Sequence, residues 1–212
     1  MERKIPITTY KSETKSKIID ITTKLFALKG YHSVSMREIA ADVDISISSL
    51  YNHYESKETI MAEILSQFED DYKHYFDWLS SQNAKANSLD EFMDNMFNKE
   101  FIEMLDPQNV LRMSFILKEQ HEFESVRKRV FELFHEFSIS KLKADFDGLI
   151  DRGIIPPADT KTIASLFMYS VLVGNDLRVH ELSGFKPPVD CKEMYSDIRR
   201  FLTAVLTRGG SC

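Results

Sequence analysis

Apolar residues recur every three to four positions along most of the chain, the spacing that places them on one face of an α-helix. The pattern predicts helices at about residues 13–29, 36–43, 47–53, 57–79, 88–105, 110–118, 124–152, 160–182 and 191–206. We find no convincing run in which apolar and polar residues alternate, as they do in a half-buried strand. The chain is therefore expected to be all-α, with about nine helices.

The stretch from residue 35 to residue 57, SMREIAADVDISISSLYNHYESK, reads as two short helices joined by a tight turn. Ser35 and Glu38 have the S-x-x-E spacing of a capping box, which begins the first helix. The second helix, Ile47–His53, presents small or hydrogen-bonding side chains between its apolar positions and has no charged residue. Its surface can therefore approach DNA closely. This is the helix-turn-helix pattern, in which the second helix enters the major groove.

The apolar positions of the first three helices also predict a small core of their own. Its members are Ile18, Thr22, Leu25, Phe26, Ile39, Ala40, Val43, Leu50 and Tyr54. Residues 1–29 carry seven basic and three acidic side chains, a net charge of +4, while the whole chain has −6 and the remainder therefore −10. The basic charge lies beside the motif, where it would neutralise phosphates.

The segment from about residue 15 to residue 65 resembles the DNA-binding domain of the TetR family of bacterial regulators. The matching residues are Phe26, Gly30-Tyr31, Ser35-Met36-Arg37-Glu38-Ile39-Ala40, Ser46-Ile47-Ser48-Ser49-Leu50-Tyr51-Asn52-His53-Tyr54 and Lys57-Glu58. Two departures concern the DNA sequence that is read. Ser48 stands where the family usually has glycine, and Ile47 stands where it often has a longer polar or basic residue.

The resemblance implies a helix-turn-helix domain at residues 1–57 and an effector-binding and dimerisation domain at residues 58–212. It also implies contacts with a palindromic operator in double-stranded DNA. Ser48, Ser49 and Asn52 would read base edges, and Ile47 would pack on a thymine methyl group. The expected contacts with the DNA backbone come from Ser35, Arg37, Tyr51, His53 and Lys57, and Ser46 is also expected to lie in the DNA interface.

The middle of the chain is rich in Phe and Met. Side chains of this kind at helical spacing usually form a core, but the family architecture implies a cavity for a small, mostly apolar effector. The expected lining residues are Phe68, Tyr72, Phe76, Met93, Met96, Phe97, Met113, Phe131 and Phe134. The helix at 57–79 has no Gly or Pro, so it could carry a movement between the domains as a rod.

A homodimer is expected to form through the helices at about 160–182 and 191–206. The stripes expected to meet the partner are Ile163, Leu166, Phe167, Ser170, Val171 and Gly174 on one helix and Met194, Ile198, Phe201, Leu202 and Val205 on the other. Ser170 and Gly174 would allow close approach of the helices.

Other classes of protein are disfavoured. The longest apolar run without a charge, 162–175, is too short to span a bilayer, and the basic N-terminus lacks the apolar core of a signal peptide. Cys191 and Cys212 give neither a disulfide framework nor a metal-ligand spacing, which fits the cytoplasm. Catalytic motifs such as a Gly-rich phosphate loop, G-x-S-x-G or H-E-x-x-H do not occur. We therefore expect no enzyme activity, cofactor or metal.

The leading interpretation is a homodimeric repressor that a small apolar ligand releases from its operator. The alternatives within DNA-binding proteins are an activator and a protein that binds DNA without a ligand. The alternative from another class is an all-helical enzyme or interaction scaffold. The motif at residues 35–57 separates these classes, because a scaffold has no need of an uncharged helix face of small residues beside a basic helix.

Overall fold

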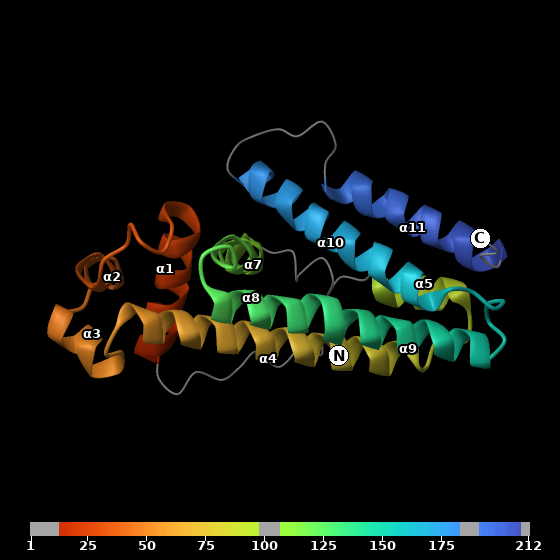
Figure 1. The fold of residues 1–212 in the computed structure, drawn as a ribbon, viewed down its shortest axis with the longest axis horizontal. Coiled ribbons are helices and arrows are strands. Elements are labelled where there is room, and N and C mark those ends of the chain that lie inside the picture. The colour runs from red at the N-terminus through yellow and green to blue at the C-terminus, as the bar shows by residue number, and fades with distance from the viewer. Residues whose placement is uncertain (1–12, 98–106, 183–190, 209–212) are drawn as a thin grey trace. The chain divides into compact units, whose positions relative to one another are not determined.

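The computed structural model describes residues 13–97, 107–182 and 191–208. With the uninterrupted helical run from Glu124 to Asp151 counted as one helix, the described residues contain nine helices and no strand, as predicted (Figure 1). The chain forms two compact units, residues 1–74 with 111–128 and residues 75–110 with 129–212. Residues 58–74 and 111–128 thus pack with the predicted DNA-binding segment, and the functional boundary at residue 57 stays a prediction.

The first unit contains α1 (Glu13–Lys29), α2 (Met36–Val43), α3 (Ile47–His53), most of α4 (Lys57–Asn83), α7 (Pro107–Glu119) from Leu111 onwards and the start of α8 (Glu124–Val130). All nine residues predicted for the small core are at most 6% exposed. The core continues into α7, where the ring of Phe115 lies 5.2 Å from that of Phe26. The three-helix motif therefore shares its interior with α7.

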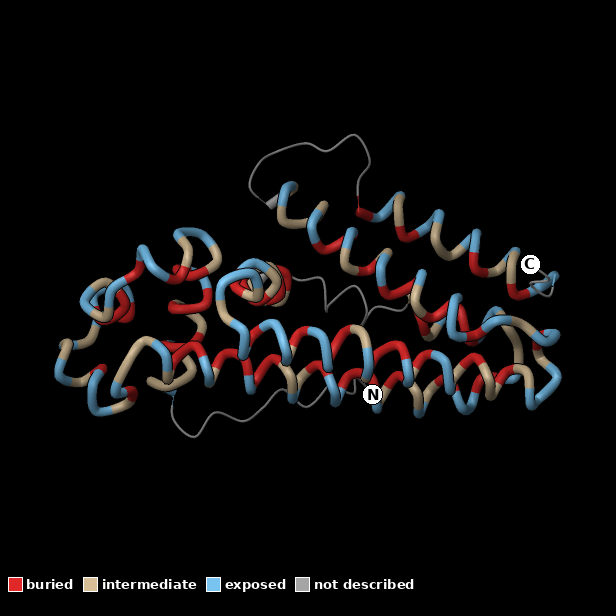
Figure 2. The backbone as a smooth tube through the Cα atoms, viewed as in Figure 1, coloured by how far each residue is buried: buried red, intermediate tan, exposed pale blue. Residues whose placement is uncertain are grey.

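The second unit contains the end of α4, α5 (Leu89–Met96), η1 (Phe131–Phe137), α9 (Ser138–Asp151), α10 (Thr160–Leu182) and α11 (Cys191–Arg208). Helix α10 packs against both α9 and α11 and runs antiparallel to each (Figure 1). Buried positions recur along the facing sides of these helices (Figure 2). The helix predicted for 88–105 begins as expected but ends at Met96, with Phe97 as its C-cap, and residues 98–106 lie outside the described part. No helix among the described residues is long and apolar enough to cross a membrane.

Helix α4 is longer than the sequence indicated, because the predicted loop 80–87 is still helical up to Asn83. The guanidinium group of Arg152 donates to the carbonyl groups of Asn83, Ala84 and Ala86 at 3.2, 2.9 and 2.7 Å. Asp145 accepts hydrogen bonds from the side chains of Ser80 (3.2 Å) and Asn83 (2.7 Å). The polar sequence Ser-Ser-Gln-Asn therefore stays helical through contacts with α9 and the residue after it.

The helix predicted for 124–152 is continuous, but its middle part, η1, is a π-helix. The hydroxyl group of Ser138 donates to the carbonyl of Leu133, five residues earlier, at 2.7 Å, and the backbone N–H of Ser138 bonds to the same carbonyl. A π segment inserts one extra residue per turn. Apolar spacing did not predict it.

The stripe predicted for the dimer contact on α10 combined two faces. Ile163, Phe167 and Val171 are buried within their own unit. The face of α10 that points away from the interior carries Leu166, Tyr169 and Val173, which are 49, 47 and 57% exposed. On α11, Leu202 is buried and Phe201 is 57% exposed. The exposed apolar face therefore consists of Leu166, Tyr169, Val173 and Phe201.

Gly174 also serves a different contact from the one predicted. A Cβ atom on Gly174 would lie 2.2 Å from the hydroxyl of Tyr195 and 2.5 Å from Cε of Met194, both on α11 of the same chain. The glycine thus allows α10 and α11 to approach each other within one protomer.

Gly174→Ala is expected to destabilise the protein by about 1–3 kcal/mol, because the added methyl group overpacks the contact between α10 and α11. Urea unfolding at fixed protein concentration measures the change. Gly148→Ala in α9 is the matched control, since a Cβ atom added there would have nothing within 4 Å. That substitution should stabilise by about 0.5–1 kcal/mol through helix propensity. Equal effects of the two substitutions would contradict this role of Gly174.

Candidate DNA interface

The helix-turn-helix segment is fixed by local contacts. The Ser35 hydroxyl accepts a hydrogen bond from the Glu38 N–H at 3.2 Å, and the Ser46 hydroxyl accepts one from the Ser49 N–H at 3.1 Å. Asp44 has a φ of 63° and closes the turn in the left-handed conformation, which Asp tolerates better than most residues. Each capping serine keeps its own O–H as a donor, so both remain available to a phosphate.

Helix α3 has one buried and one open side. Leu50 and the following Tyr54 are buried against the core. The predicted base readers Ser48 and Asn52 are exposed, and Tyr51 is 52% exposed. The other predicted contacts are partly exposed, namely Ile47, Ser49 and His53. An uncharged polar surface of this kind suits close approach to the major groove.

The basic residues near the motif differ in what they already bind. Arg37, at the start of α2, is exposed, as the predicted phosphate contact requires. Lys29 pairs with Glu38; their hydrogen bond raises the pKa of the lysine and lowers the pKa of the carboxyl group. Lys15 lies over the ring of Tyr54, 5.2 Å from its centroid.

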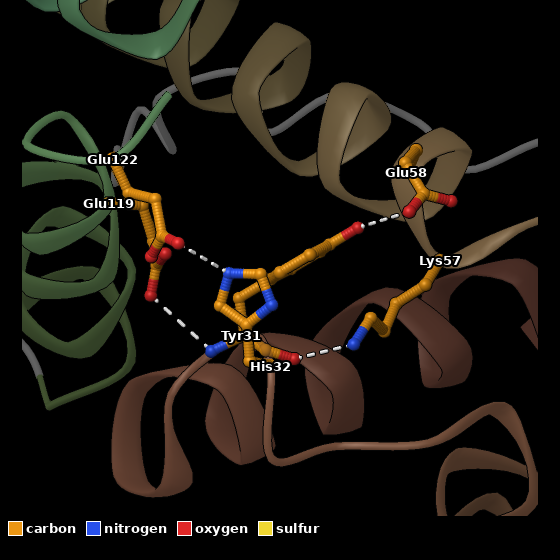
Figure 3. A network of polar contacts seen from close by, with 6 residues as sticks. All are labelled: Tyr31, His32, Lys57, Glu58, Glu119 and Glu122. Carbon is orange, nitrogen blue, oxygen red and sulfur yellow. Dashed lines mark hydrogen bonds and ion pairs between the residues drawn. The ribbon is translucent and has the colours of Figure 1, made fainter. Parts of the chain in front are cut away.

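The ammonium group of Lys57 forms hydrogen bonds with backbone carbonyl groups of the first unit. It donates to the carbonyl group of Tyr31 at 2.7 Å (Figure 3). It also donates to the carbonyl group of Val34 at 2.8 Å and lies 4.2 Å from the centroid of the Tyr31 ring. An ammonium group has three N–H donors. The predicted phosphate contact therefore has one donor left at most.

The predicted ligand-lining residues lie in both units. Phe68, Tyr72 and Met113 are buried in the first unit. In the second unit Phe97 is partly exposed, and the buried members are Phe76, Met93, Met96 and Phe134. Phe131 is 53% exposed and stacks on the ring of His135, so it lies on the surface instead of lining the interior.

Two polar contacts in the first unit could not be predicted from the spacing of the apolar residues. Arg112 on α7 forms an ion pair with Asp71 on α4 at 3.0 Å and lies over the ring of Phe68. Glu119, the last residue of α7, is only 5% exposed and accepts a hydrogen bond from the backbone N–H of Tyr31 at 3.3 Å. Both contacts join residues at least 41 positions apart. Within the described residues, no three His, Cys, Asp or Glu side chains are grouped so that they could hold a metal ion.

Comparison with known proteins supports the motif. Residues 18–64 match the model of the family described as bacterial regulatory proteins, tetR family. The chain is 29% identical over 153 residues to the negative transcriptional regulator IcaR of the icaADBC biofilm operon of Staphylococcus aureus strain Newman. That match covers 64% of this chain and 77% of IcaR.

Solved structures share the fold at low sequence identity. The complex of SmeT with triclosan has a TM-score of 0.72 and 17% identity, and the match covers 94% of each chain. FadR of Bacillus subtilis in complex with stearoyl-CoA has a TM-score of 0.63 and 15% identity, and the match covers 92% of this chain and 98% of FadR. Residues 18–64 therefore carry the DNA-binding segment of the tetR family of bacterial regulatory proteins, within an all-helical fold that these solved structures share.

Proposed function

We propose that this regulator is a homodimeric repressor that binds a palindromic operator and is released by a small, mostly apolar ligand. The observation that carries the DNA-binding part is the open side of α3, where Ser48, Tyr51 and Asn52 are exposed and no residue of the helix is acidic or basic apart from His53. Ser and Asn side chains bond base edges, while the hydroxyl groups of Ser35 and Tyr51 suit phosphates. Repression is supported by the similarity to IcaR, which is a negative regulator.

The dimer is supported by the exposed apolar face of Leu166, Tyr169, Val173 and Phe201. The first three lie at i, i+3 and i+7, hence on one side of α10. Gly174 lies against Tyr195 and the two helices are antiparallel, so Phe201 is level with the part of α10 between Leu166 and Tyr169. A two-fold axis would bring this face onto its copy in a partner. A dimer that reads two half-sites on one side of DNA must hold its two α3 helices one turn of DNA apart, about 34–36 Å.

The ligand is proposed to bind among the buried Phe and Met side chains. SmeT and FadR, which share the fold, are solved with triclosan, a small aromatic compound, and with stearoyl-CoA, whose acyl chain is apolar. Phe68, Tyr72 and Phe76 follow one another at intervals of four on α4, so a ligand that displaces them would move a helix whose first residue, Lys57, is bonded to the loop before α2. A hundredfold loss of operator affinity requires about 2.7 kcal/mol of preference for the released state.

Binding to DNA from upstream of the protein's own gene tests the proposal. Asn52→Ala is expected to lower the ratio of specific to random DNA affinity about 10- to 100-fold, the value of a bidentate contact with a base. The salt dependence should stay the same, because Asn52 neutralises no phosphate. Fluorescence anisotropy at two salt concentrations measures both quantities, with Asn87→Ala, an exposed asparagine before α5, as the control.

Equal affinity of the wild type for specific and random DNA would contradict a sequence-specific regulator. An equal loss on both DNAs with Asn52→Ala would remove Asn52 from the base readers. Addition of an apolar ligand to the same assay tests release: a ligand that binds the protein while operator affinity stays unchanged would contradict the proposed switch.

A further inference from the structure

The loop from Gly30 to Val34 joins α1 to the helix-turn-helix motif, and its conformation sets where α2 begins. Gly30 has a φ of 83° and ends α1 with a hydrogen bond from its N–H to the Phe26 carbonyl at 2.9 Å. Val34 then bonds back to Tyr31, and the next residue, Ser35, caps α2. A change in this loop would therefore displace the N-terminus of α2, where Ser35 and Arg37 are proposed to contact phosphates.

From one side the loop is held by α4. The Lys57 ammonium group donates to two carbonyl groups of the loop, those of Tyr31 near its start and Val34 at its end. The Tyr31 hydroxyl donates to Glu58 at 2.8 Å (Figure 3). Burial, and then this bond to a carboxylate, raise the pKa of Tyr31 well above its usual value, so the hydroxyl stays a donor.

From the other side the loop is held by the end of α7 and the turn that follows. Glu119 accepts the backbone N–H of Tyr31 (Figure 3). The ring of Phe123 meets the ring of Tyr31 edge-on at 5.2 Å and stacks on His32 at 5.9 Å. An ion pair of 2.9 Å joins His32 to Glu122, but both side chains are more than half exposed, so it contributes little.

Two local factors disfavour a glutamate at position 119. A carboxylate at the C-terminus of a helix faces the negative end of the helix dipole, and a buried carboxylate loses its hydration. Neither the stability of α7 nor core packing therefore accounts for a glutamate there. The contact that it gains is with the loop, and departures from local preference of this kind tend to mark functional positions.

We propose that Lys57 and Glu119 are positioning residues, which fix the loop before α2 and thereby set DNA affinity without touching DNA. The inference rests on the proposed DNA-binding function and assigns Lys57 a role other than the predicted phosphate contact. It also gives α7 a direct contact with the DNA-binding motif. A displacement of α7 would then reach the loop through Glu119.

The salt dependence of operator binding separates positioning from phosphate contact. A lost phosphate contact flattens the slope of log affinity against log salt by about 0.9. Lys57→Met keeps the stem of the side chain and removes its donors, and Glu119→Leu removes the acceptor. Each is expected to lower operator affinity about tenfold while the slope changes by less than about 0.3, because the bound complex keeps its phosphate contacts.

Three further variants serve as controls. Glu119→Gln keeps an oxygen that can accept the Tyr31 N–H, so its affinity should stay within about threefold of the wild type. Glu122→Gln, in the exposed ion pair, should have no effect. Arg37→Met is the positive control, since the loss of a proposed phosphate contact should flatten the slope. A second readout is hydrogen exchange of the Tyr31 amide, which should be faster in Glu119→Leu than in Glu119→Gln.

Several outcomes would overturn the proposal. A flattened slope in Lys57→Met would make Lys57 a phosphate contact, and unchanged affinity in Glu119→Leu would remove Glu119 from the positioning residues. If Glu119→Leu does not fold, Glu119→Asp, whose carboxylate is one methylene shorter, must show the same loss. If the wild type itself fails to bind the operator, the proposed function fails, whereas exchange of the Tyr31 amide still tests how the loop is held.

Discussion

Replacement of Leu166 and Phe201 together by aspartate is expected to yield a folded monomer whose operator affinity is lower by about 100-fold or more. Both side chains are about half exposed on the outer face of α10 and α11, so the substitutions disturb little within one protomer. In a dimer the new carboxylates would be buried without partners, which is strongly unfavourable. A monomer contacts one half-site only and loses the gain in affinity from binding two half-sites at once.

Sedimentation equilibrium at micromolar concentration measures the change of mass, and circular dichroism checks that the helices remain. Ser140→Asp, which adds a carboxylate at an exposed position of α9, is the matched control and should stay dimeric. A wild type that is already monomeric, or a double variant that remains a dimer, would show that this face is not the interface. Reduced operator binding by a dimeric variant would point instead to damage within the protomer.

Elements that are defined by local contacts were predicted well. Helices α1, α3 and α10 begin and end where the apolar spacing placed them. The capping hydroxyls of Ser35 and Ser88 accept the N–H groups of Glu38 and Glu91, three residues further on. Such contacts span a few residues, so the sequence displays both partners together.

Features that depend on distant partners could not be predicted. Arg152 extends α4 through contacts about 69 positions away, and Glu119 reaches Tyr31 across 88 positions. The outer and inner faces of α10 are both apolar, so spacing alone could not separate Leu166 from Phe167. A lysine at position 57 matches the family pattern, but the carbonyl groups that it binds lie 23 and 26 positions earlier and are brought to it by the folded loop.

The ion pair between Asp71 on α4 and Arg112 on α7 is another contact between residues far apart in the sequence, and it joins the two helices within the first unit. The side chain of Arg112 is 12% exposed and that of Asp71 is 25% exposed, and their nearest charged atoms are 3.0 Å apart. Arg112 also lies 5.5 Å from the centroid of the Phe68 ring. A pair this sheltered from water has lost much of its hydration, so each charge depends strongly on the other.

Asp71→Ala is expected to destabilise the protein by about 2–4 kcal/mol, because it takes this carboxylate away from the guanidinium group of Arg112 in a poorly hydrated place. Asp71→Leu combined with Arg112→Met should cost less than about 1 kcal/mol, since the apolar pair removes both charges at once. Urea unfolding of both variants and the wild type at one protein concentration measures the two changes in stability. Lys143→Ala, in the exposed pair with Asp147, is the control and should change stability by about 0.5 kcal/mol or less.

The functional consequence follows from the position of Arg112 on the helix that ends at Glu119. If the pair holds α7 in place, Asp71→Ala should also speed hydrogen exchange of the Tyr31 amide, whereas Lys143→Ala should leave it unchanged. A double variant that is stable but whose Tyr31 amide exchanges rapidly would show that the directional contact between guanidinium and carboxylate, and not apolar packing, places α7. Equal destabilisation by the single and double variants would mean that Asp71 acts through other neighbours, and the ion pair would lose its assigned role.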